Sequence, residues 1–131
     1  MYRKALGVVL ALIAGKSLAV DVDKPAPGWV TIGATVNGTV YEAKISTWKI
    51  TSNAKGKKVA SVSGQVKDKQ SSNIEFYTWQ VTLDDCKAEA GTLYTLTLAG
   101  KYVREASFMF DGGSVASTVA EEICAITKTG S

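Results

Sequence analysis

The sequence contains no histidine, and only two of its 131 residues are cysteine. Histidine is the usual general base and a common metal ligand near neutral pH, so its absence removes the simplest route to a hydrolytic or metal-dependent enzyme. Serine and threonine are plentiful, but a hydroxyl nucleophile needs a nearby base, and no lysine lies in a motif that would make it one. We therefore expect a protein without enzymatic activity, metal or cofactor.

The sequence also has little excess charge outside its first residues. Residues 1–19 contain Arg3, Lys4 and Lys16 and no acidic residue, and the rest of the chain carries as many acidic as basic side chains. The formal net charge of +3 therefore comes from the N-terminal segment alone. Because proteins bind nucleic acid through clustered positive charge, we do not expect a nucleic-acid partner.

Long hydrophobic runs are scarce as well, and the clearest one lies at the N-terminus. Arg3 and Lys4 precede an apolar stretch, and Ser17-Leu18-Ala19 follows it. This is the pattern of a secretory signal peptide, which we predict for residues 1–19. The alternative is a membrane anchor, but the run is well short of the ~20 residues that span a bilayer. We expect an exported protein, periplasmic or secreted, with no membrane span and no lipidation cysteine near the cleavage site.

The two cysteines are Cys86 and Cys124. In an oxidising compartment, an even pair is most simply one disulfide. Such a crosslink stabilises a small domain by about 4 kcal/mol on chain-entropy estimates. The alternatives are a metal-binding pair and a reactive thiol, and the lack of histidine weakens the first of these.

The chain beyond the signal peptide divides into three parts. Both prolines fall within residues 20–28, which we interpret as an extended lead-in. Residues 29–126 are predicted to form a single domain, and residues 127–131 a short tail. The domain consists of short alternating runs separated by polar turns, a pattern typical of an antiparallel meander.

Asn37-Gly38 is the clearest turn signal in the domain. This dipeptide tolerates the positive φ angles of a type I′ turn, whose twist matches that of paired strands. We therefore predict a hairpin with a two-residue loop, which sets Ala34 opposite Tyr41.

The run from Ile74 to Leu83 shows the strongest alternation. Tyr77, Trp79 and Val81 share one face, and Phe76 lies on the other. If a helix covers only one face of the sheet, Phe76 and its neighbours become an exposed interaction surface.

Strict alternation also raises a question about Cys86. It places this cysteine on the same face as Thr82, away from Trp79. Either the helix covers the Thr82 face, or Asp84-Asp85 forms a bulge that turns Cys86 over. We favour the bulge, because the apolar face is the one that needs to be covered.

The pattern changes to a helical one near the C-terminus. Val115, Val119 and Ile123 recur every four residues, and Ser114 is a suitable N-cap. A helix this short is marginal alone and must dock on the sheet, with Cys124 as its tether. Together these patterns predict an α+β protein: a strongly twisted antiparallel sheet with a C-terminal helix tethered by a disulfide.

Lysines are densest at Lys55, Lys57 and Lys58, and Lys67 and Lys69 in the next turn are candidates to lie near them. Clustered lysines can bind an acidic polysaccharide, anionic headgroups or a protein. The alternative is an ordinary solvated turn whose charges discourage edge-to-edge pairing. Our candidate binding residues are therefore these three lysines of the first group, Lys55, Lys57 and Lys58, together with Phe76.

Asp84-Asp85 is the most suggestive acidic pair. Neighbouring residues on a strand point to opposite faces, so the two carboxylates converge only if they lie in a turn. We interpret them as a solvated strand end.

Four segments together resemble a known family. They are Trp29-Val30-Thr31-Ile32-Gly33, Gly38-Thr39-Val40-Tyr41, Asp85-Cys86 and Ala120-Glu121-Glu122-Ile123-Cys124. These segments resemble the surface-adhesin protein E-like family of small exported bacterial proteins. The resemblance implies an antiparallel sheet of about six strands, joined to a C-terminal helix by a Cys86–Cys124 disulfide. It also implies adhesion to host extracellular-matrix proteins, although this chain lacks the lipidation cysteine of the family's adhesin.

Our functional expectation is an exported, non-enzymatic, adhesin-like binding module. Its partner would be a protein or glycan at the cell envelope or outside the cell, with host extracellular matrix among the candidates. A homo-oligomer is compatible with this expectation. The alternative function is that of a periplasmic enzyme inhibitor or an envelope-assembly factor.

Overall fold

The computed structural model describes residues 27–128. The predicted signal peptide, most of the lead-in and the end of the tail lie outside the described residues. Within this part, the chain forms one antiparallel sheet of six strands, which neighbour one another in chain order. The strands are β1 (Trp29–Ala34), β2 (Thr39–Ser52), β3 (Lys58–Asp68), β4 (Asn73–Thr82), β5 (Ala90–Leu96) and β6 (Tyr102–Met109). The helices are α1 (Leu83–Ala88), which follows β4, and α2 (Val115–Lys128), which follows β6.

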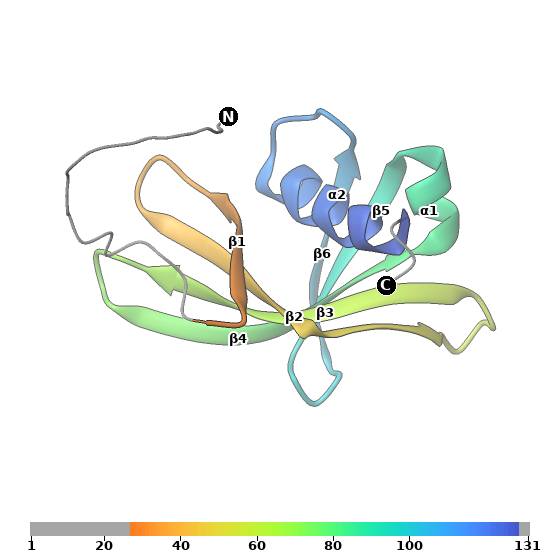
Figure 1. Cartoon of the computed structure of the whole chain (residues 1–131), viewed down its shortest axis with the longest axis horizontal. Coiled ribbons are helices and arrows are strands. Elements are labelled where there is room, and N and C mark those ends of the chain that lie inside the picture. Colours follow the sequence, from red (N-terminus) through yellow and green to blue (C-terminus); the bar gives the residue numbers. More distant parts are fainter. Residues whose placement is uncertain (1–26, 129–131) are drawn as a thin grey trace.

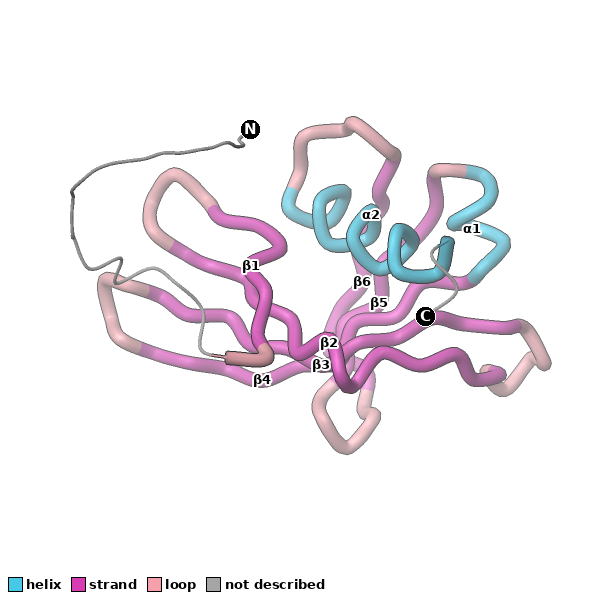
Figure 2. The backbone as a smooth tube through the Cα atoms, viewed as in Figure 1, coloured by secondary structure: helices cyan, strands magenta, loops and turns pink. Residues whose placement is uncertain are grey.

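Both helices lie on the same face of the twisted sheet (Figure 1). Helix α2 contacts the outer strands β1 and β6, as well as β3 and β4 between them. The long strands β2 and β3 extend beyond the helices, as the tube view shows (Figure 2). The predicted α+β architecture, with its antiparallel sheet and C-terminal helix, is confirmed.

The core lies between α2 and the sheet face beneath it. Trp79 and Val81 of β4 are buried there, with exposed fractions of 2% and 0%. The apolar face of β4 is therefore the covered one, as the alternation predicts. Helix α2 contributes a stripe of buried side chains, which are Ser117, Val119, Ala120, Ile123 and Cys124.

Gly64 of β3 leaves room for the indole ring of Trp79. A Cβ atom at residue 64 would lie 2.4 Å from Cζ3 of Trp79 and 2.2 Å from the carbonyl oxygen of Glu42. Both distances are far inside van der Waals contact, so the absence of a side chain is what lets the ring approach β3 this closely.

The β1–β2 hairpin has a different loop from the predicted one. Ala34 pairs with Val40 rather than Tyr41, and the amide of Thr35 donates to the carbonyl of Thr39. The loop therefore has three residues. Gly38 has a positive φ of 96° but Asn37 does not, whereas a type I′ turn needs positive φ at both central positions.

The same loop recurs in two other hairpins. Residues 53–57 and 97–101 also enclose three residues ending in a positive-φ glycine, Gly56 or Gly100. In all three loops, the side chain of the first residue accepts a hydrogen bond from the amide of the last. The first residues are Thr35, Asn53 and Thr97. A threonine or asparagine three residues before the positive-φ glycine is therefore part of the turn signal, because its side chain accepts a hydrogen bond from the amide four residues later.

Helix α1 replaces the expected bulge before Cys86. Thr82 is its N-cap, and the Thr82 Oγ1 accepts a hydrogen bond from the Asp85 amide at 3.1 Å. One helical turn rotates Cys86 into the core, where it is buried. The bulge expectation is wrong because a Thr-x-x-Asp pattern caps a helix start, and this signal outweighs strand continuation.

The Cys86–Cys124 disulfide is present, with the two Cα atoms 5.5 Å apart. It joins α1 to α2, so it ties the C-terminal helix to the end of β4 through a second helix. Ser114 caps α2 as predicted, because its Oγ accepts a hydrogen bond from the Ser117 amide at 3.0 Å. Helix α2 is thus fixed at its start by a cap and further along by a covalent bond.

Gly64→Ala is expected to destabilise the protein by about 2 kcal/mol, because the new methyl group overpacks the site beneath Trp79. Urea denaturation followed by tryptophan fluorescence measures the change in the free energy of unfolding.

Gly33→Ala is the matched control. A Cβ atom at residue 33 would lie 3.5 Å from the Thr118 Cγ2, an ordinary contact, so its stability should stay within about 0.5 kcal/mol of the parent. Equal stability of the Gly64→Ala variant and the parent would contradict the close approach of the indole to β3.

Candidate functional site

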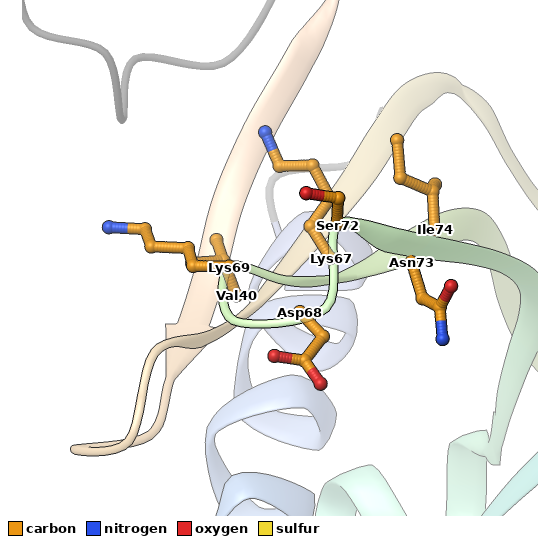
Figure 3. Close-up of a pocket in the computed structure, with 7 residues that line it drawn as sticks. All are labelled: Val40, Lys67, Asp68, Lys69, Ser72, Asn73 and Ile74. Carbon is orange, nitrogen blue, oxygen red and sulfur yellow. The ribbon is translucent and has the colours of Figure 1, made fainter.

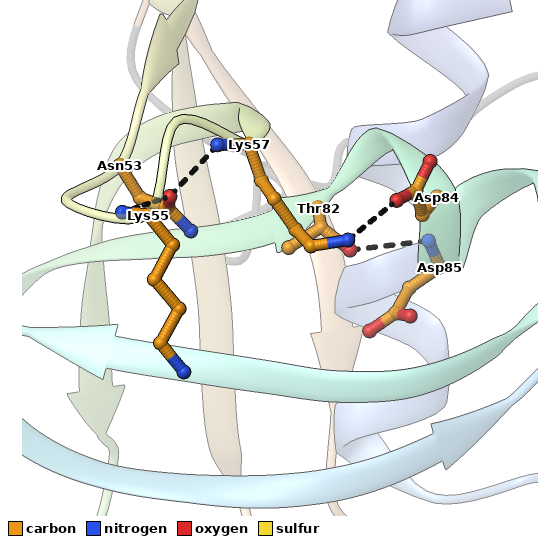
Figure 4. Close-up of polar contacts among 6 residues, drawn as sticks. All are labelled: Asn53, Lys55, Lys57, Thr82, Asp84 and Asp85. Atoms are coloured by element: carbon orange, nitrogen blue, oxygen red, sulfur yellow. Dashed lines mark hydrogen bonds and ion pairs between the residues drawn. The ribbon is translucent and has the colours of Figure 1, made fainter.

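The loop over residues 53–57, here called the lysine turn, does not gather its positive charges. The Lys57 Nζ lies 3.1 Å from the Asp84 Oδ2, whereas the Lys55 side chain extends in another direction (Figure 4). Lys58 begins β3. The Lys57–Asp84 pair is mostly exposed, with 57% and 71% of the two side chains accessible to solvent. Exposed ion pairs of this kind contribute at most about 1 kcal/mol to the free energy of unfolding.

Asp84 and Asp85 lie in the first turn of α1 rather than at a solvated strand end, and their carboxylates diverge. Asp84 pairs with Lys57, and the Asp85 Oδ2 accepts a hydrogen bond from the Thr92 amide at 3.1 Å. Each carboxylate therefore has a separate structural partner. The pair does not form a shared acid–base site.

Lys67 and Lys69 lie at the opposite end of β3 from the lysine turn, so the expectation that they join it is wrong. Strand β3 is 11 residues long and separates the two groups. The Lys67 Nζ lies instead 2.9 Å from the Oε2 of Glu42, a residue with an exposed fraction of 0%. The Glu42 Oε1 accepts a hydrogen bond from the Gln65 Nε2 at 2.7 Å. The buried carboxylate is thus partnered by one hydrogen bond at Oε1 and by the Lys67 charge at Oε2, which makes no hydrogen bond within the described residues.

A pocket of about 340 Å³ lies beside the β3–β4 turn. Its polar lining residues include Lys67, Asp68, Ser72 and Asn73. Their side chains point in different directions rather than toward one another (Figure 3). A specific site needs polar groups that converge on a ligand, so this pocket is a weak candidate.

Phe76 lies on the sheet face opposite the helices, as the sequence predicts if only one face is covered. Its exposed fraction is 50%, and that of Ile74, two residues earlier on the same face, is 51%. Among the described residues, β5 pairs with β4 only over Thr78–Gln80. Residues 73–77, here called the β4 edge, therefore have a strand neighbour on one side only, which is β3.

A second feature was not predicted from the sequence: a cleft of about 360 Å³ between the sheet and the first half of α2. We call it the helix cleft. Its apolar lining comes from both the sheet and the helix, and includes Tyr41, Trp79, Leu93, Ala106, Val115 and Val119. Its polar lining comes from three neighbouring strands, and consists of Glu75, Tyr77, Thr95 and Arg104.

The polar groups of the helix cleft form a short chain. The Arg104 guanidinium lies over the Tyr77 ring, 5.4 Å from its centroid. The Tyr77 hydroxyl donates a hydrogen bond to the Glu75 Oε1 at 2.7 Å. This hydrogen bond favours the neutral phenol and is the largest cause of a raised pKa of Tyr77. Tyr77 is therefore a protonated donor at neutral pH.

Within residues 27–128, no group of three or more histidine, cysteine, aspartate or glutamate side chains is placed to hold a metal ion. Neither α1 nor α2 has the length and apolar character that crossing a membrane requires.

No protein-family model, curated protein or solved structure matches this chain. The protein E-like resemblance therefore stays a prediction, and the functional argument depends on the geometry of the chain itself.

Lys67→Met is expected to destabilise the protein by about 3 kcal/mol, because it leaves the Glu42 carboxylate buried without its cation. The double variant Glu42→Gln/Lys67→Met should recover most of that loss, since it removes the buried charge as well. Urea denaturation at neutral pH measures both.

Lys57→Met is the control, because it breaks an exposed ion pair, and its effect should stay below about 1 kcal/mol. If Lys57→Met costs as much as Lys67→Met, burial of Glu42 is not what makes the Lys67 pair important.

Proposed function

We propose that this protein is an exported, non-enzymatic, adhesin-like binding module that recognises a protein partner through the β4 edge. The observation that carries the proposal is an open strand edge beside two half-exposed apolar side chains, Ile74 and Phe76. An extended segment of a partner can add to such an edge as a further strand. Main-chain hydrogen bonds then give affinity, and alternate side chains give specificity.

The path of the next hairpin explains why the β4 edge is open. After Leu96 the β5–β6 hairpin turns away from β4, and its loop points in a different direction from the β3–β4 turn (Figure 1). The backbone groups on that side of residues 73–77 are therefore not covered by β5. In folded proteins an uncovered edge of this kind is usually blocked, so an unblocked one indicates an interaction site.

The other two sheet edges carry features that discourage pairing. Strand β1 has a register shift between Thr31 and Gly33, and irregularities of this kind disrupt an edge ladder. Strand β6 carries two adjacent charged residues, Arg104 and Glu105, in its middle. The β4 edge has a single charged residue, Glu75, between two apolar ones. Its composition is the most suitable of the three for strand addition.

Three further points support export and adhesion. The Cys86–Cys124 disulfide suits an oxidising compartment. The N-terminal pattern over residues 1–19 is that of a signal peptide. The resemblance to the protein E-like family suggests host extracellular-matrix proteins as the partner class.

An envelope-assembly factor could use the same edge. Protease accessibility on intact cells separates an adhesin from an assembly factor, because an adhesin must be reachable from outside the cell.

Peptides selected from a random peptide library on the purified mature chain should bind in extended form at the β4 edge. Hydrogen exchange of the complex should show new protection of backbone amides within residues 73–77. The double variant Ile74→Ser/Phe76→Ser should weaken binding about tenfold, a loss of about 1.4 kcal/mol.

Leu98→Ser is the matched control, because Leu98 is also exposed, at 60%, but lies in the β5–β6 loop. It should leave peptide binding unchanged. Protection confined to another strand, or equal losses in the two variants, would rule out the β4 edge as the binding site.

A further inference from the structure

The helix cleft lies on the other side of the sheet from the apolar side chains that carry the proposed function, although Glu75 and Tyr77 of the β4 edge also line it. Phe76 and Ile74 lie on the sheet face opposite the helices, whereas the cleft opens between the sheet and α2. The cleft also has the three properties of a small-molecule site, which are a concave shape, a mostly apolar lining and a few polar groups near one another.

Small side chains keep the cleft open. Ala106 of β6 lies directly across from Leu93 of β5, and Ala116 faces the cleft from α2. A larger side chain at either alanine would fill the space that lies above Trp79 and Leu93. The floor of the cleft is buried, whereas Ala106 at its wall is exposed, so a small molecule can enter from solvent.

Two polar groups at one end of the cleft are adjacent. Thr95 and Arg104 are cross-strand partners in the β5–β6 register, so their side chains leave the sheet as close neighbours on the same face. Thr95 is buried, with an exposed fraction of 5%. Its hydroxyl makes no hydrogen bond to the described residues and lines the cleft. It is therefore positioned to donate to a ligand.

Arg104 supplies the charge. Among residues 27–128, no carboxylate lies within ion-pair distance of its guanidinium. The Tyr77 ring lies beneath it and holds it at the mouth of the cleft. The nearby Glu75 accepts a hydrogen bond from the Tyr77 hydroxyl. A guanidinium without a carboxylate beside an apolar cavity is complementary to an anionic group on an apolar body.

We propose that the helix cleft binds a small amphiphile that consists of an apolar chain or ring and one terminal carboxylate. The carboxylate accepts hydrogen bonds from Arg104 and from the Thr95 hydroxyl. The apolar part lies against Leu93, Val115 and Val119. A volume of about 360 Å³ is near the lower end for ligand sites, so the ligand is the size of a medium-chain fatty acid or a single-ring aromatic acid.

Titration calorimetry of the oxidised mature chain with sodium octanoate and with octanol tests this proposal, because the two probes differ mainly in charge. Octanoate should bind about tenfold more tightly than octanol. Arg104→Gln should remove that preference while leaving octanol binding unchanged. Glu75→Gln should strengthen octanoate binding severalfold, because it removes a like charge near the site.

Ala106→Phe should abolish the binding of both probes by filling the cleft, and circular dichroism checks that this variant is folded. Lys101→Gln is the charge-matched control and should change neither affinity. Equal affinities of the parent for octanoate and octanol, no binding of either, or an unchanged preference in Arg104→Gln would overturn the proposal. Ile74→Ser/Phe76→Ser should bind octanoate normally, so the two proposals can fail independently.

Discussion

The docking of α2 on the sheet is the constraint on which the rest of the structure depends. A helix of 14 residues is marginal in isolation, and so is a single hairpin. Each gains stability only by burying its apolar face against the other. Val119 and Ile123 of the helix are almost fully buried against the sheet, and the Cys86–Cys124 disulfide holds the helix there. Helix α2 therefore reaches the strands at both edges of the six-stranded sheet.

Both candidate binding features lie where β4 and the β5–β6 hairpin separate. Helix α2 contacts β6, and the β5–β6 hairpin leaves β4 after a short stretch of pairing. This departure opens the β4 edge. The helix cleft lies on the other side of the sheet, where α2 passes over Ala106 and Thr95 without filling the space above them. Ile74 and Phe76 thus lie on the face opposite the cleft, whereas Glu75 and Tyr77 belong both to the β4 edge and to the cleft lining.

Local patterns in the sequence predict the architecture of the fold, but not the length of the first hairpin loop, helix α1 or the candidate site. Alternation around Trp79 and the four-residue period of the helix predict which faces are buried, because both signals lie within one element. Helix α1 was missed, although Thr82 and Asp85 have the spacing of a capping pair and so carry a signal for its start. The helix cleft has no such local signal, because it depends on the Thr95–Arg104 register. That register is set by the loop between two strands and by the way the sheet twists.

The strand order has a consequence for how the chain folds. Every strand pairs with its immediate neighbour along the chain, so each hairpin closes over a short stretch of chain. The exception is α2, the last described element, which must reach back to β1 across the whole sheet. Hairpins can therefore form one after another while their apolar face stays exposed to solvent. The native Cys86–Cys124 pairing therefore requires that the last described helix has reached the end of β4.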